Sequence, residues 1–222
     1  MKAVVVLFLV GTCSSLGAHD VITTKITWAR EISRLVFNRC ASCHHEGGSS
    51  FSLTKYEEAR PWAKAIKEEA LERRMPPWGA VKGFGDFRDD QGLTQEELHL
   101  ISDWVEGGAP EGDPALLPKL PDFTAPAANP HTGAELTVDG SLTLHHTATL
   151  VAIRPNILME GSSIQVVARR PDGSFEPLLW LYQYKPQYAH TYFYRTPLHL
   201  PAGTRVEVSP AGAGTISLVL SP

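Results

Sequence analysis

One five-residue string constrains this sequence more than any other feature: Cys40-Ala41-Ser42-Cys43-His44. In a C-x-x-C-H string, two thiols three positions apart can form thioethers with one edge of a porphyrin, and the imidazole that follows can bind the porphyrin iron. The string therefore predicts one covalently attached haem c. Cys40 and Cys43 are the predicted attachment sites, and His44 is the predicted proximal iron ligand.

Two other kinds of site use the same pair of cysteines. A thioredoxin-like redox pair opens a helix after a strand, whereas the residues before Cys40, from Trp28 to Arg39, show the apolar spacing of a helix. A zinc site would need a second pair of ligands, and the chain's third cysteine is Cys13. We therefore favour haem over both.

The N-terminus has the layout of a secretory signal peptide. Lys2 is followed by an apolar run over residues 3–10 and then by small residues up to Ala18. The run is much shorter than the roughly 20 apolar residues of a membrane-spanning helix, so we expect no membrane span. Residues 1–18 are predicted to be removed on export, which makes the mature protein periplasmic or extracellular in a bacterium.

A haem iron needs a sixth ligand unless it is left open, and the mature chain has two methionines, Met75 and Met159. Met75 lies in the run RRMPPW, where two prolines would hold an extended segment across the distal face. We therefore predict Met75 as the distal iron ligand; the alternative is a methionine that fills a gap in the core. A thioether raises the reduction potential, and a six-coordinate iron has no vacant site, which favours electron transfer over catalysis.

The same run supplies three candidate haem contacts: Arg73, Arg74 and Trp78. The two arginines would pair with the haem propionates. Basic residues are also common at helix C-termini for electrostatic reasons, and this second explanation has equal weight.

Helical patterns surround the predicted ligands. Apolar side chains recur every three or four positions before Cys40, and residues 54–73 are rich in helix formers. Thr94 and Glu97 form a capping-box pattern ahead of a third helix. Residues 19–109 are therefore predicted to form an all-α, cytochrome c-like domain.

Four motifs resemble those of the mono-haem cytochrome c domain of exported bacterial proteins: CASCH, SFSLTKYEEARPWAK, RRMPPW and LTQEELHLISDWVEGGAPEGD. The resemblance covers about residues 25–115. It implies one haem c with His44 and Met75 as axial ligands, which agrees with the interpretation of the residues themselves. Because this ligation leaves no vacant site on the iron, we expect an electron carrier rather than an enzyme.

The composition changes after this region. Residues 110–133 are rich in proline and are predicted to form a semi-rigid linker. In residues 134–222, short runs of β-branched and aromatic residues alternate with turn signals, which predicts an all-β sandwich or jelly-roll-like domain. The candidate strands are residues 148–153, 164–170, 178–184, 205–208 and 215–220. The predicted fold class is thus α + β, in two domains.

Residues 153–208 resemble the C-terminal domain of copper type II, ascorbate-dependent monooxygenases. That family places a His-x-His copper pair where this chain has Asn156 and Leu158. An amide and an aliphatic side chain do not replace two imidazoles as copper ligands. We therefore expect a degenerate domain without copper.

The predicted function is that of a single-electron carrier whose redox partner protein is unidentified. A net charge of −4 offers no basic surface for nucleic acid. Two alternatives stay open. One is a docking protein whose β-domain recognises a partner while the haem is auxiliary; the other is a subunit of an oxidative, monooxygenase-like enzyme.

Overall fold

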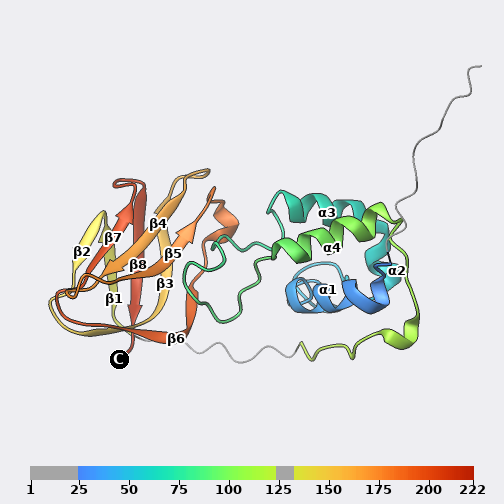
Figure 1. Ribbon diagram of the computed structural model, residues 1–222, viewed down its shortest axis with the longest axis horizontal. Coiled ribbons are helices and arrows are strands. Elements are labelled where there is room, and N and C mark those ends of the chain that lie inside the picture. Colours follow the sequence, from blue (N-terminus) through green and yellow to red (C-terminus); the bar gives the residue numbers. More distant parts are fainter. Residues whose placement is uncertain (1–24, 124–132) are drawn as a thin grey trace, which may run out of the picture.

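The computed structural model describes residues 25–123 and 133–222 (Figure 1). The α-helices lie in the first range and the strands of both sheets lie in the second. None of the helices in these two ranges is long and apolar enough to cross a membrane. The predicted signal peptide, residues 1–18, lies outside the described residues.

Short helices form the first part of the chain. They are the π-helical turn η1 (Trp28–Ile32), α1 (Ser33–Arg39), α2 (Tyr56–Ala59), the 3-10 turn η2 (Arg60–Trp62), α3 (Ala63–Leu71), α4 (Gln95–Glu106) and the 3-10 turn η3 (Pro114–Leu116). The predicted capping box begins α4: the Glu97 amide donates to Thr94 Oγ1 (3.1 Å), and the Thr94 amide donates to the Glu97 carboxylate (2.7 Å). The rings of Trp28 and Trp104, 6.1 Å apart, belong to the apolar cluster that joins η1, α1 and α4.

Two antiparallel, four-stranded sheets form the second part. Their strands are β1 (Glu135–Asp139), β2 (Ser141–Thr143), β3 (Ala148–Leu158), β4 (Ile164–Arg169), β5 (Phe175–Leu181), β6 (Tyr192–Leu200), β7 (Arg205–Ser209) and β8 (Gly214–Leu220). The strand orders are β1-β8-β3-β6 and β2-β7-β4-β5. In β4 the side chains of Ile164, Val166 and Ala168 are buried while Gln165 and Arg169 are exposed, as the two-residue period of a strand requires. Both sheets contribute to one buried core.

All five candidate strands overlap observed ones. Four of them overlap β3, β4, β7 and β8, and the fifth overlaps β5, which begins earlier than expected, at Phe175. No candidate strand corresponds to β6, which contains Pro197. Proline donates no ladder hydrogen bond and is tolerated mainly at sheet edges, and β6 is an edge strand.

Residues 72–94 connect α3 to α4 and leave the helices to reach the sheets (Figure 1). Ala80 forms an antiparallel bridge with Leu181 of β5, and Phe87 forms one with Tyr194 of β6. Three side chains of this connection belong to the buried core of the sheets: Trp78, Ala80 and Phe87.

The expected fold class, an all-α N-terminal domain followed by an all-β domain, is wrong. Among the described residues, the two sheets supply more of the regular structure than the helices do, and the longest helix, α4, has 12 residues. The segment 72–94 is not an α-helix and contributes to the core of the sheets. Two adjacent prolines, Pro76 and Pro77, and the glycines that follow oppose a helix there, and the sheets bury the apolar side chains between them.

Candidate functional site

Four predicted site residues line one cavity: Cys40, Cys43, His44 and Met75. We call it the motif cavity; it contains about 1000 Å³ of empty space, including the part open to solvent. Cys40 follows the last residue of α1, and Met75 follows the end of α3, so two helix ends present these side chains to the same space. Apolar side chains supply much of the remaining wall: Leu53, Trp62, Ile66, Pro77, Leu93 and Ile101.

The ring of His44 is oriented by a backbone hydrogen bond. Its Nδ1 lies 2.9 Å from the carbonyl oxygen of Phe51, and the two rings meet edge to face with centroids 5.0 Å apart. A carbonyl oxygen only accepts, so Nδ1 is the donor and Nε2 of the neutral ring keeps its lone pair. Histidines that bind metals usually donate their other ring N–H in this way. The local geometry therefore suits His44 for iron binding through Nε2.

The two thiols are not joined in a disulfide. Burial, and secondly the negative charge of Glu97, raise the pKa of the Cys40 thiol to about 12. Redox-active C-x-x-C pairs depend on a cysteine with a lowered pKa, because the thiolate is the nucleophile. The environment of Cys40 therefore opposes the thioredoxin-like alternative.

Met75 lies at the mouth of the motif cavity. The amides of Arg74 and Met75 both donate to the carbonyl oxygen of Glu69, at 2.9 and 3.1 Å, and so end the last turn of α3. The Met75 side chain is 46% exposed, and the neighbouring Phe51 and Trp62 are 51% and 49% exposed. Half-exposed apolar side chains around an open cavity are typical of a site that an apolar ligand covers.

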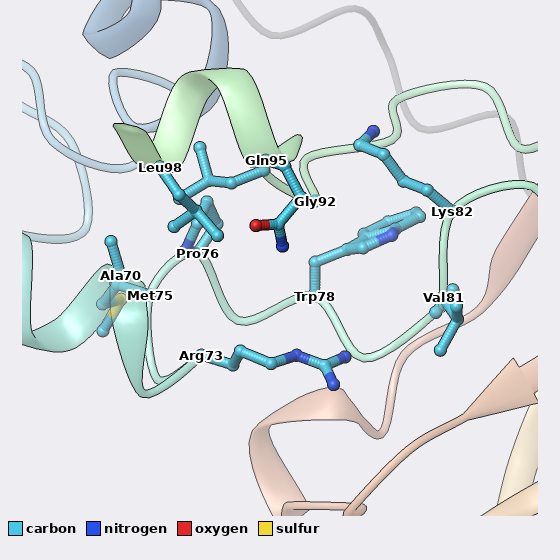
Figure 2. A pocket seen from close by; sticks show the side chains of 12 residues that line it. Ala70, Arg73, Met75, Pro76, Trp78, Val81, Lys82, Gly92, Gln95 and Leu98 are labelled. Atoms are coloured by element: carbon cyan, nitrogen blue, oxygen red, sulfur yellow. The ribbon is translucent and has the colours of Figure 1, made fainter. Parts of the chain in front are cut away.

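The three other predicted haem contacts do not line the motif cavity. Arg73 extends from the end of α3 in a different direction from Met75 (Figure 2), and its guanidinium carbon lies 5.4 Å from the centre of the Tyr182 ring. Arg74 forms a bidentate ion pair with Glu69, both contacts being 2.8 Å. Trp78 is buried and lines a second cavity together with Arg73. Contact of Arg73, Arg74 and Trp78 with haem stays a prediction.

Two polar residues of the motif cavity were missed by sequence reasoning. Arg39 lines the cavity and is held by Glu97, at 2.8 Å, and by the carbonyl oxygen of Asp90, at 2.6 Å. Its position directly before Cys40 is a signal that could have identified it. Gln91 also lines the cavity and donates to Ser42 Oγ (3.0 Å); it is distant in sequence from the motif, so no local pattern marks it.

At the two positions where the resembled family has its copper pair, the structure places an amide and an aliphatic side chain in other contacts. Asn156 exchanges hydrogen bonds with Ser217, at 2.8 and 3.2 Å, and Leu158 packs against the core. His145, His146 and His199 are exposed, as is Met159. Across residues 25–123 and 133–222, no three His, Cys, Asp or Glu side chains gather as a group that could hold a metal ion.

The residues around the motif cavity fit a covalently held haem. Two thiols, an imidazole nitrogen with a free lone pair and a thioether share one cavity with apolar walls, and these are the groups that a c-type haem with His/Met ligation requires. Comparison with models of known protein families gave no match to this sequence, and a search of curated proteins gave none either.

Proposed function

We propose that this protein is an exported, mono-haem c-type cytochrome that carries single electrons to or from a redox partner protein. One observation carries the proposal: Cys40, Cys43, His44 and Met75, separated by up to 35 positions in sequence, line the same cavity. The resemblance of residues 25–115 to mono-haem cytochrome c domains supports it from the sequence alone.

Each residue has a separate task in this proposal. The thiols of Cys40 and Cys43 hold the porphyrin covalently, and the Phe51 carbonyl keeps Nε2 of His44 available for iron. The Met75 thioether would be the second side chain that binds the iron, and would exclude water and oxygen from it. Bound haem supplies reversible one-electron chemistry between ferric and ferrous iron. With two side chains bound, the iron would have no vacant position, which would favour electron transfer over oxidative catalysis.

The proposal is tested by expressing the full chain in the periplasm of a host that attaches haem to C-x-x-C-H motifs. We expect a coloured protein whose mass increases by one haem, and we expect that haem to remain attached after denaturation. The double variant Cys40→Ser/Cys43→Ser should lose the covalent attachment and serves as the control. A colourless product with both thiols still titratable would contradict the proposal.

A further inference from the structure

One buried tyrosine of the second part contacts both ends of the segment that carries Met75. Tyr188, in the 3-10 turn η4 (Pro186–Tyr188), is 1% exposed, and its hydroxyl donates to the carbonyl oxygen of Arg73. Its ring lies against Gly79: a Cβ atom at this glycine would come within 2.5 Å of Cδ2 and 2.7 Å of Cγ of the ring. Tyr188 therefore holds positions 73 and 79, on either side of Met75.

Further contacts hold the N-terminal end of this segment. Lys185 Nζ donates to the carbonyl oxygen of Glu72 (3.1 Å), and the Tyr182 ring lies beside the Arg73 guanidinium. Arg73 has a φ of 56°, in the left-handed region that is unfavourable for a residue other than glycine. These contacts from residues 182–188 stabilise that backbone turn directly ahead of Met75.

The C-terminal end is held by an aromatic cluster. The Trp78 ring lies 4.9 Å from the Tyr192 ring and 5.3 Å from the His190 ring, measured between centroids. Two residues further on, Ala80 pairs with β5. Both ends of the short segment are thus fixed to the second part of the chain, although Met75 itself is only half buried.

We propose that the second part of the chain positions the distal ligand, and that Tyr188 is the main positioning residue. This inference rests on the proposed function, because it assigns Met75 to the iron. A side chain that is 46% exposed receives limited restraint from its own packing. The restraint comes from the fixed ends of its loop, since holding the backbone on both sides reduces the conformational freedom that ligation must otherwise remove. The sheets would therefore influence how firmly Met75 binds the iron, without contacting the haem themselves.

Tyr188→Phe tests the inference, because it removes only the hydroxyl that holds the Arg73 carbonyl. In the haem-loaded ferric protein, added imidazole competes with Met75 for the iron, so a weaker Met75–iron bond appears as a higher apparent affinity for imidazole. We expect an increase of about three- to tenfold, the size that corresponds to one net hydrogen bond. Gly79→Ala, which pushes the Tyr188 ring away, should act in the same direction.

Tyr182→Phe is the matched control, because it removes the hydroxyl of a nearby, more exposed tyrosine and keeps the ring beside Arg73. Circular dichroism identifies conditions in which every variant is folded. The variant Met75→Ala, which removes the competing thioether, gives the upper limit of the imidazole affinity. If Tyr188→Phe and Gly79→Ala match Tyr182→Phe while Met75→Ala differs from all three, the positioning role is wrong and the proposed ligand stands. If Met75→Ala also leaves the affinity unchanged, Met75 is not the ligand and the proposed His/Met site itself fails.

Discussion

The two parts of the chain bury their apolar side chains to different extents. In the sheets, side chains such as Leu178, Leu179 and Leu181 are fully buried in one core. Around the motif cavity, Phe51, Trp62 and Met75 are about half exposed, although the neighbouring helices bury apolar clusters of their own. Apolar surface left in water contributes little to stability, so these three side chains stabilise the haem-free chain less than the leucines of the sheets do. They are the side chains that the proposed haem would cover.

Preventing haem attachment should change the free energy of unfolding more than any other variant, and this change should be confined to the helical part. In Cys40→Ala/Cys43→Ala, we expect the free energy of unfolding of residues 28–106 to fall by about 4 kcal/mol or more, because the variant loses the apolar burial and the Met75–iron bond that the attached haem would make only in the folded state. The sheets should change little. Hydrogen exchange resolved by peptide, compared between the haem-loaded protein and the variant, measures both parts in one experiment. Equal loss of protection in helices and sheets would show that the two cores are not independent.

Truncating one apolar side chain in each part should give the next largest difference. Leu179→Ala in β5 should lower the free energy of unfolding by about 3 kcal/mol, whether or not haem is present, because it leaves a cavity in a closed core. Trp62→Ala should cost less than about 1 kcal/mol in the haem-free protein and clearly more in the haem-loaded one. Urea unfolding of each variant, with and without haem, measures these free energies. If Trp62→Ala greatly lowered the free energy of unfolding of the haem-free protein, the Trp62 ring would not be a surface that haem covers.

The two methionines of the mature chain, one in each part, provide a matched pair of variants. Met75→Ala should abolish the sulfur-to-iron charge-transfer band of the ferric protein and lower the reduction potential by on the order of 100 mV, since a thioether ligand favours the ferrous state. Met159 is 70% exposed at the end of β3, so Met159→Ala should change neither quantity. Absorption spectroscopy of the two variants measures the band, and redox titration measures the reduction potential. An altered band in Met159→Ala, with Met75→Ala unaffected, would reverse the ligand assignment.

Sequence reasoning identified what is local and missed what depends on distant contacts. Cys40, Cys43 and His44 lie in one cavity because they are close in sequence, and Met75, a candidate because methionine is scarce in this chain, lines the same cavity. The role of each at a haem stays a prediction. The expected all-α domain failed because the burial of Trp78 depends on residues of β6 far along the chain. The contact between Tyr188 and Arg73 spans 115 positions, and no period or spacing marks it.

The smallest predicted effect concerns the interface that joins the two parts. His190 packs beside the rings of Trp78 and Tyr192, and its Nε2 is buried with no hydrogen-bond partner among the described residues. Burial lowers the pKa of its imidazole, opposed in part by a hydrogen bond with the backbone of Gln187. The folded state therefore binds this proton less readily than the unfolded state, whose histidine has a pKa of about 6.5. Stability from the neutral ring is complete above that pH and is lost as the pH falls toward the folded-state pKa. We expect the urea midpoint to decrease between pH 7 and pH 5 by more in the native protein than in His190→Gln, which has no proton to gain at this position. Equal decreases in the two proteins would assign the acid sensitivity to the other histidines and carboxylates, and would leave the packing of Trp78 on β6 independent of pH.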